Sequence, residues 1–228
     1  MIMITGASGG IGNFLLKSFH EEGEIVSGTY NSTNRVSDLE NILFQVDITS
    51  LSSIESWINS LKSNFKKIVL INCASISYSA FAHKSDIQKW KHVIDVNLTG
   101  TFNVIHALLP IMREQNFGRI INFSSVVAQL PTPGVSAYAA SKSALWGLAK
   151  SLASENGSKG ITINNINMGY ANIGMGINDV PPEYQQQMKK RIPSGKFCEP
   201  EDILKTVKFL IDTDYLNGTT IDLNGALA

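Results

Sequence analysis

Short apolar runs alternate along the chain with longer segments in which apolar residues recur at helical spacing. The run Ile68–Asn72 is apolar without alternation, which is typical of a strand buried on both faces of a parallel sheet. Seven segments are expected to form strands: Met1–Thr5, Ile25–Tyr30, Leu43–Val46, Ile68–Asn72, Arg119–Phe123, Ile161–Ile166 and Thr220–Leu223. Five are expected to form helices: Ile11–Glu22, Ser52–Asn64, Ile87–Arg113, Ala137–Glu155 and Pro200–Ile211.

This order of elements predicts an α/β fold: a single-domain, Rossmann-like, doubly wound sheet of about seven parallel strands with helices on both faces. The sequence 1–228 contains no linker, repeat or low-complexity tract that would divide it, so we expect one domain. The least regular segment is Gly169–Arg191, rich in Gly, Asn, Pro and Gln. We expect it to be either a lid over a substrate or a long surface connection.

Composition and charge narrow the class of partner. The chain has 228 residues, 43% hydrophobic and 17% charged, which is typical of a globular protein. Its 19 basic and 19 acidic residues balance, so bulk charge favours neither nucleic acid nor an anionic membrane, and we expect a small-molecule partner. No apolar stretch is long enough for a membrane span, and the first residues lack the basic region of a signal peptide.

Cysteine and histidine usage points to the cytoplasm and away from a metal. Cys73 and Cys198 are the only two cysteines and form no disulfide framework, which favours a reducing compartment. The four histidines share no metal-ligand spacing, so we expect no metal site.

A glycine-rich turn follows the first expected strand and opens the first expected helix. Gly6 permits a tight strand-to-helix turn, Gly10 lets the backbone approach a pyrophosphate, and Gly12 lets the helix pack closely on the sheet. The helix N-terminus offers free N–H groups and the positive end of its dipole to phosphate oxygens. We therefore predict that this turn binds the phosphates of a dinucleotide. The expected contacts are Thr5, Gly6, Ser8, Gly9, Gly10, Ile11 and Gly12.

The tip of the second expected strand bears on the choice of cofactor. It reads Gly28-Thr-Tyr-Asn-Ser32, with no carboxylate that would bind the 2′-hydroxyl of NAD and repel a 2′-phosphate. NADP(H) is therefore favoured over NAD(H). Asn31 and Ser32 are expected to donate to the phosphate, and Arg35 either joins them or is a solvated loop charge. Asp47, with Ile48 beside it, is expected to contact the adenine.

Two residues of the Tyr138-Ala-Ala-Ser-Lys142 segment suggest proton transfer. A separation of four in a helical pattern places both side chains on one face, one turn apart. We expect the ammonium of Lys142 to stabilise the phenolate and lower the tyrosine pKa from about 10. Such a phenol exchanges a proton with a carbonyl oxygen near neutral pH. Asn97 lies in a helical pattern where Asn is unfavourable, so its position requires a reason.

With Asn72-Cys-Ala-Ser75 and Arg191–Pro200, these motifs resemble the short-chain dehydrogenase/reductase family over the whole chain. The resemblance implies that Tyr138 is the general acid in carbonyl reduction. It also implies that Lys142 lowers the pKa of that tyrosine and holds the nicotinamide ribose. Ser125, rather than Ser124, is implied to bind the substrate carbonyl.

The resemblance extends to three further contacts and a proton relay. Asn97 is implied to support a water-linked relay to Lys142. Asn72, Ala74 and Gly169 are implied to line the cofactor cleft.

The chain departs from the family pattern at four places. Ser75 stands where a second Gly is usual after the fourth strand, and Met168 stands where Pro usually precedes Gly169. Ile173 lies near the position of the Thr that would bind the carboxamide. Gly10 occupies a position where many NADP-dependent members carry a basic residue, which bears on cofactor choice. The four implied catalytic residues are intact, which argues against an inactive relative.

The sequence looks most similar to 3-oxoacyl-[acyl-carrier-protein] reductases through Gly118–Val127 and the segment around Ile192–Phe197. In those reductases, basic residues near the ends of the two long central helices help to dock the acidic carrier protein. Here that region has Asn116 and Lys159, so a sugar, polyol or other small carbonyl is an alternative substrate. A cofactor-binding regulator with little catalysis is a third alternative.

The two long central helices also predict self-association. They carry small and apolar residues around more than one face, which requires cover on both sides. We expect a homo-oligomer, either a tetramer or a dimer. Neither Gly169–Arg191 nor Ser77–Lys84 carries a pattern diagnostic of one substrate, and the direction of the reaction is left open.

Overall fold

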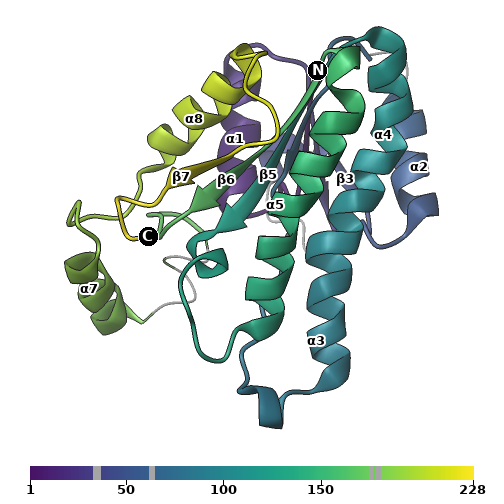
Figure 1. Ribbon diagram of the computed structural model, residues 1–228. Helices are drawn as coiled ribbons and strands as arrows, with labels where there is room; N and C mark the ends of the chain where they lie inside the picture. The colour runs from purple at the N-terminus through teal and green to yellow at the C-terminus, as the bar shows by residue number, and fades with distance from the viewer. Residues whose placement is uncertain (33–36, 62–64, 175–176, 178–180) are drawn as a thin grey trace.

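The computed structural model describes residues 1–32, 37–61, 65–174, 177 and 181–228. Within these residues one seven-stranded sheet forms the centre, in the order β3-β2-β1-β4-β5-β6-β7, with every pairing parallel (Figure 1). The strands are β1 (Ile2–Thr5), β2 (Val26–Tyr30), β3 (Leu43–Gln45), β4 (Val69–Asn72), β5 (Gly118–Ser125), β6 (Ile161–Met168) and β7 (Thr220–Leu223). The expected doubly wound sheet of parallel strands is confirmed.

Helices cover both faces of the sheet. The α-helices are α1 (Gly10–Glu21), α2 (Leu51–Leu61), α3 (Ile87–Ile94), α4 (Thr101–Gln115), α5 (Ser136–Asn156), α7 (Pro182–Arg191) and α8 (Pro200–Asp212). Short helical turns are η1 (Ser37–Ile42), η3 (Ala82–Lys84), η5 (Val126–Ala128) and η6 (Gly157–Lys159). Helices α1 and α8 pack on one face, and α2, α4 and α5 pack on the other (Figure 1).

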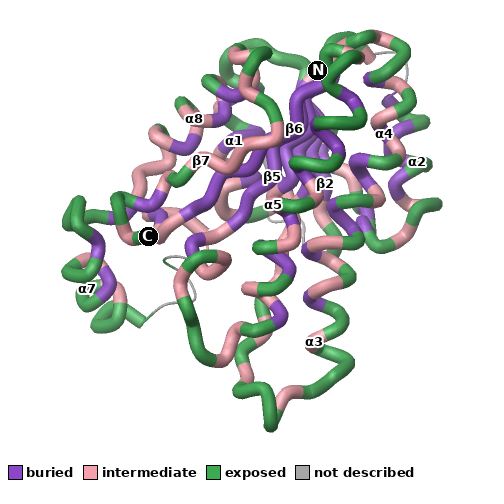
Figure 2. Tube along the Cα trace, in the orientation of Figure 1, coloured by how far each residue is buried: buried purple, intermediate pink, exposed green. Residues whose placement is uncertain are grey.

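Alternation of side chains along each strand supplies both hydrophobic cores. In β1, Ile2 and Ile4 belong to the core beneath α1 and α8, whereas Met3 belongs to the core beneath α2, α4 and α5. Strands β1, β4, β5 and β6 are accordingly buried along the centre of the molecule (Figure 2). This burial on both faces explains why a central strand such as β4 is an apolar run without alternation.

The expected helix over Ile87–Arg113 is interrupted. Residues Asp95–Gly100 form a π-helical segment, η4, between α3 and α4. Its wider turn includes Asn97, the residue whose place in a helical pattern required a reason. π-Helical turns inside α-helices occur mostly at functional positions.

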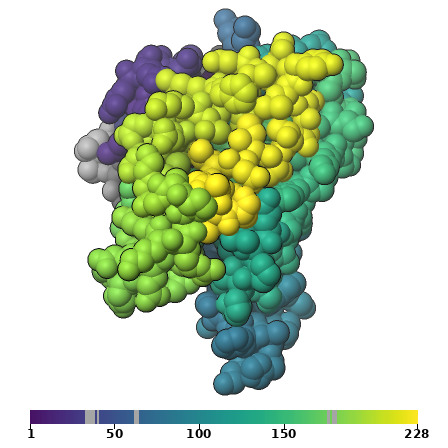
Figure 3. Space-filling model, turned by 60° about the vertical axis from the view of Figure 1, so that its left-hand side comes forward, coloured from purple at the N-terminus to yellow at the C-terminus, as the bar shows by residue number. Residues whose placement is uncertain are grey.

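The last ten residues of the segment Gly169–Arg191 form a regular helix, α7, which the sequence did not lead us to expect. Pro182 stands in the first turn with Glu183, and three basic residues stand in the last turn, which are favourable helix-end positions. Helix α7 and the η3–α3 region both project beyond the body of the molecule at the end where β5 and β6 finish (Figures 1 and 3).

A row of polar side chains crosses five strands on the α5 face of the sheet. Asn72 Nδ2 donates to Asn122 Oδ1 at 2.9 Å, and Asn122 Nδ2 donates to Asn165 Oδ1 at 3.1 Å. Thr5 Oγ1 donates to Asn72 Oδ1 at 3.5 Å, and Asn165 Nδ2 donates to Thr220 Oγ1 at 3.1 Å. The five residues are aligned pair by pair in the strand register. We call this row the asparagine ladder.

Candidate active site

The turn after β1 takes its shape from missing side chains. Gly6 has a φ of +66°, and a Cβ there would lie 2.7 Å from the Cα of Ala74. A Cβ on Gly12 would collide with the carbonyl oxygen of Gly6. Helix α1 follows Gly9, which has no side chain to cap it, and its first turn holds no acidic residue. The first N–H groups of α1 are thus not capped by a side chain at its start, and the backbone cradle suits dinucleotide phosphates.

The beginning of the expected lid lies against this turn. Gly10 has a φ of +51°, and a Cβ there would lie 3.1 Å from the Cα of Gly174. Gly174 also has a positive φ, +66°. Two glycines are therefore required for the backbone after β6 to pass this close to the first turn of α1.

The positions expected to hold the adenosine end lie after β2 and β3. Asn31 and Ser32 are exposed, and the carbonyl oxygen of Asn31 accepts from Gln45 Nε2 at 2.9 Å. Asp47 is exposed, and its Oδ1 accepts from the backbone N–H and the hydroxyl of Thr49. Ile48 is buried beside Gly100. Arg35 lies outside the described residues.

Asn97 fastens the chain that leaves β4. Its Oδ1 accepts from the N–H of Ile76 and its Nδ2 donates to the carbonyl oxygen of Ile76, both at 2.9 Å. Nδ2 also donates to Ser141 Oγ at 3.1 Å. The amide thus pairs with the backbone as a neighbouring strand would, and it connects this backbone to α5. No sequence pattern pointed to Ser141, because serine occurs in helices for many structural reasons.

Tyr138 is brought together with two serines. Burial raises the pKa of Tyr138, which is the largest effect. Hydrogen bonding with Ser125 lowers this pKa, and hydrogen bonding with Ser75 lowers it by a smaller amount. Ser125 ends β5, and Ser75 lies three residues beyond the end of β4. Ser75 appeared in the sequence only as a departure from the family pattern, and nothing in the one-dimensional spacing placed it beside the phenol.

Lys142 is buried one turn along α5 from Tyr138. Its Nζ donates to the carbonyl oxygen of Phe123 at 2.8 Å and lies 5.5 Å from the centre of the Tyr138 ring. Burial lowers the pKa of Lys142 to about 8, against a smaller opposing effect of Cys73. Burial also raises the pKa of Cys73 well above its usual range.

The expectation of a lowered tyrosine pKa is wrong for this structure. The ammonium of Lys142 is engaged by the Phe123 carbonyl oxygen, and the burial of the phenol is the largest influence on the pKa of Tyr138. Removing a phenol from water disfavours its charged form. Spacing in a helix predicts proximity, but it carries no information about this loss of hydration.

Ser124 holds α5 against β5. Its Oγ donates to the carbonyl oxygen of Lys142 at 2.9 Å and accepts from Trp146 Nε1 at 2.8 Å. The neighbouring Ser125 is the last residue of β5, and its hydroxyl interacts with Tyr138. The two adjacent serines therefore have different surroundings.

The departures after β6 are accommodated by packing. Met168 is buried and pairs with Leu223 in the sheet. A Cβ on Gly169 would lie 2.8 Å from the Cα of Asn224, so the close approach requires glycine. Ile173 is partly buried against the core on the α1 and α8 side.

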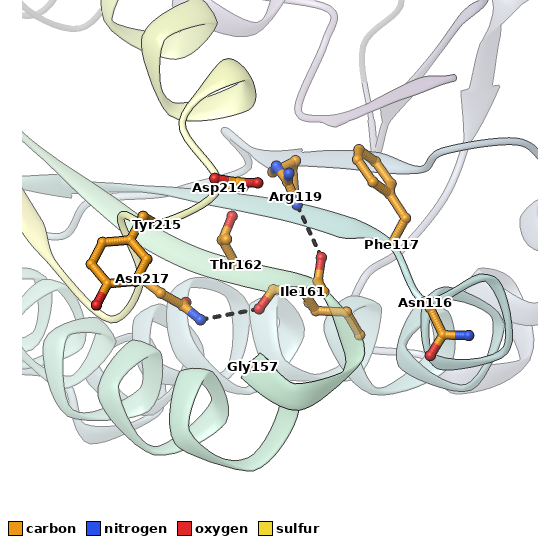
Figure 4. A pocket seen from close by; sticks show the side chains of 10 residues that line it. Asn116, Phe117, Arg119, Gly157, Ile161, Thr162, Asp214, Tyr215 and Asn217 are labelled. Atoms are coloured by element: carbon orange, nitrogen blue, oxygen red, sulfur yellow. Dashed lines mark hydrogen bonds between the residues drawn. The ribbon is translucent and has the colours of Figure 1, made fainter.

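A separate cavity of about 370 Å³ lies at the opposite ends of the strands, where β5, β6 and β7 begin (Figure 4). Arg119 lines it, but this guanidinium already donates to the carbonyl oxygens of Ile211, Gly118 and Gly160. The guanidinium carbon also lies over the ring of Phe117, 4.5 Å from the ring centre. Arg119 thus joins strand ends, and the cavity is remote from Tyr138.

The described residues contain neither a membrane-spanning helix nor a cluster of metal ligands. Among them, no helix has the length and apolar character needed to cross a membrane. Within the same residues, no three His, Cys, Asp or Glu side chains are grouped as ligands for a metal ion.

Comparison with known proteins gives a consistent set of similarities. A family model described as short chain dehydrogenase matches residues 1–183. A 3-oxoacyl-[acyl-carrier-protein] reductase of Staphylococcus aureus is 33% identical over 99% of this chain and 96% of its own length. An acetoacetyl-CoA reductase of Rhizobium meliloti is 34% identical over 98% of this chain and 96% of its own length.

A solved structure extends the comparison to the fold. It is described as a candidate gluconate dehydrogenase of Agrobacterium tumefaciens and superimposes with a TM-score of 0.89 at 26% identity. It covers 100% of this chain, which covers 95% of that one.

Proposed function

The chain belongs to the short-chain dehydrogenase family, and from this premise we propose that Tyr138 delivers the proton in an NAD(P)H-dependent carbonyl reduction. The same residues serve the reverse oxidation of an alcohol. The observation that carries the proposal is the grouping of Tyr138 with Ser125 and Lys142 around the carboxyl end of β5. Carboxyl ends of parallel strands are where ligands bind in open α/β sheets.

The raised pKa of Tyr138 suits a proton donor. A phenol that is kept protonated by burial holds its proton until a carbonyl oxygen begins to gain negative charge. Ser125 then holds that oxygen by a hydrogen bond, and Tyr138 transfers its proton to it. Lys142, which has a pKa of about 8, is mostly charged at neutral pH and holds the nicotinamide ribose. The cofactor, when bound, supplies the hydride.

The residues after β1 and β2 would hold the rest of the cofactor. We propose that the N–H groups at the start of α1 bind the pyrophosphate, together with the backbone of Gly6–Gly9. Asn31 and Ser32 would bind a 2′-phosphate. The absence of a carboxylate in Gly28–Ser32 supports NADP(H) as the preferred cofactor. Asn72, Ala74 and Gly169 would line the nicotinamide end, with Asp47 and Ile48 at the adenine.

A 3-oxoacyl thioester is the substrate that we propose first. The relatives named for such thioesters are 33% and 34% identical along nearly the whole chain. A sugar or polyol is the second candidate, supported by the fold similarity to the candidate gluconate dehydrogenase. It is also supported by Asn116, which ends α4 in a left-handed conformation where a docking surface for an acidic carrier would use a basic side chain.

The experiment is a comparison of NADPH oxidation with acetoacetyl thioesters and with sugar ketones. We expect turnover of the thioester. Turnover of a sugar ketone alone would favour the second substrate class over the first. Turnover of neither substrate would favour a cofactor-binding regulator over an enzyme. Titration with NADPH and NADH, followed by nicotinamide fluorescence, measures cofactor preference independently of the substrate.

Assembly, the lid and location complete the proposal. On α4, Phe102 is 40% exposed and stacks on His106 at 5.9 Å between ring centres, which supports a homo-oligomer formed through the central helices. Sedimentation at micromolar concentration tests it, with a dimer or tetramer expected.

We propose residues 169–191 as the substrate lid and the cytoplasm as the location of the enzyme.

A further inference from the structure

Ser75 carries a hydroxyl that is costly to bury. Ser75 lies three residues after the end of β4. Its Oγ is shielded from water and has no hydrogen-bond partner of full geometry among the described residues. Hydroxyls in this condition are rare in native structures and call for an explanation. Among the described residues, this hydroxyl interacts only with the phenol of Tyr138, and the contact lacks the geometry of a full hydrogen bond.

The backbone on both sides of Ser75 is fixed in place. The N–H of Ala74 donates to Thr5 Oγ1 at 3.2 Å, and Ile76 exchanges two hydrogen bonds with the amide of Asn97. One residue before Ser75 is thus tied to β1, and one residue after it is tied to η4. Such support holds a side chain in one direction, as a site for chemistry requires.

We propose that Ser75 is a positioning residue for proton transfer, whose hydroxyl donates a hydrogen bond to the Tyr138 oxygen when that oxygen becomes negative. The inference rests on the proposed function. In the step, the carbonyl carbon of the substrate receives the hydride from the cofactor, and its oxygen gains negative charge. The O–H bond of Tyr138 breaks, and a new O–H bond forms on that substrate oxygen. Ser75 keeps its own proton throughout.

The effect of Ser75 is expected to be larger in the transition state than before it. A hydrogen bond to a charged oxygen is about twice as strong as one to a neutral oxygen. Only interactions that strengthen toward the transition state accelerate the reaction. Catalytic hydrogen bonds are often long in the free enzyme and shorten in the complex, which explains the incomplete geometry of Ser75.

The charge state of the phenol supports the same role. Ser75 and Ser125 both lower the pKa of Tyr138, against the burial that raises it. Ser125 is expected to turn toward the substrate oxygen during the reaction. Of these two serines, Ser75 is then the one whose hydroxyl still faces the phenolate.

The test uses Ser75→Ala, with Ser75→Thr to restore a hydroxyl. Ser85→Ala is the matched control, because Ser85 also has a buried hydroxyl without a partner in the described residues but lies before α3, outside the proposed machinery. The first measurement is phenolate absorbance against pH in the free protein. Subtracting the Tyr138→Phe curve isolates Tyr138 from the other five of the six tyrosines.

In this titration we expect Ser75→Ala to raise the pKa of Tyr138 by about one unit, because a donor to the phenolate is lost. Ser75→Thr and Ser85→Ala are expected to titrate as the unmodified protein does. An unchanged Tyr138 titration in Ser75→Ala overturns the proposal. This result requires no turnover, so it stands even if the proposed reaction fails.

The second measurement is the pH profile of turnover. We expect kcat to fall about tenfold in Ser75→Ala with KM changed less than about twofold, since the bond forms in the transition state. The rise of alcohol oxidation with pH, which needs the phenolate, should move about one unit higher. A fall in kcat without that movement would indicate a merely structural role. The melting temperature should not fall, because the buried hydroxyl has no full hydrogen bond to lose.

Discussion

The two ends of the proposed cleft are built in opposite ways. After β1, the shape depends on absent side chains, since a Cβ on Gly6 or Gly12 would strike backbone. After β4 and β5, it depends on side chains that bond to backbone, as Asn97 does to Ile76 and Lys142 does to Phe123. The first end binds through N–H groups that any sequence has, and the second acts through particular side chains. Substitutions should therefore fail differently at the two ends.

The largest effect should come from the side-chain end. Tyr138→Phe removes the proton donor while keeping the ring that lies beside Lys142. We expect kcat to fall about a thousandfold, in the range of general acid catalysis. Affinity for NADPH, measured by nicotinamide fluorescence, should remain because the glycine turn is untouched. Retention of biological activity by this variant would favour the regulator and remove the enzyme proposal.

At the glycine end, Gly12→Ala should lose binding and stability together. The added Cβ meets the Gly6 carbonyl oxygen, and neither backbone can move freely. We expect the free energy of unfolding to fall by about 1–3 kcal/mol, as overpacking does. NADPH affinity should fall at least tenfold, because the turn must shift. Gly147→Ala is the control, since its Cβ would meet nothing within 4 Å and alanine favours a helix. Unchanged NADPH affinity in Gly12→Ala would contradict this account.

Lys142→Met should separate stability from function. Burial depresses the pKa of Lys142 from 10.5 to about 8, so the charged form destabilises the folded state at neutral pH. Between pH 8 and 10.5 the unfolded chain binds the additional proton, and the stability of the unmodified protein rises with pH. We expect the variant to be inactive, yet more stable at pH 7 by about 1–3 kcal/mol. Denaturant unfolding should show this advantage shrinking from pH 8 upward, and a constant difference would contradict the pKa.

The smallest effect should come from Ser124→Ala, beside the reacting groups but outside them. The change removes the hydroxyl that joins the Lys142 carbonyl oxygen and the Trp146 N–H. We expect a loss of about 1 kcal/mol in the free energy of unfolding, with kcat within about threefold of the unmodified protein. Ser125→Ala is the matched change and should lower kcat about a hundredfold, as loss of an oxyanion donor does. Equal effects of both changes would show that the two serines were not distinguished correctly.

Much of the fold could be predicted because burial on both faces leaves a plain signal. Apolar runs such as Ile68–Asn72 located the strands, and the strand–glycine–helix order located the phosphate-binding turn. Helix α7 was missed because its polar sequence, with three consecutive glutamines, has no apolar periodicity. Its helical signals lie instead at its ends.

The electrostatics of the candidate site could not be predicted from spacing. Tyr138 and Lys142 are neighbours as expected, but burial shifts both pKa values against the charged form. Ser75 lies 63 positions from Tyr138 in the sequence, and only the folded sheet brings the end of β4 to α5. The π-helical turn at Asn97 follows from tertiary contacts to Ile76 and Ser141.

The asparagine ladder has a consequence for how the sheet assembles. Sliding one strand by a single residue would turn its polar side chain to the α1 and α8 face, among Ile4, Ile71 and Ile121. Each buried amide without a hydrogen-bond partner would then destabilise the fold by about 1–3 kcal/mol. The ladder residues on the two neighbouring strands would lose their partners as well. Apolar strands of similar composition tolerate misalignment, and parallel sheets form slowly from distant segments. The asparagine ladder therefore fixes the register of strand pairing. Several registers would bury the apolar side chains equally well, but only one pairs the ladder residues with each other.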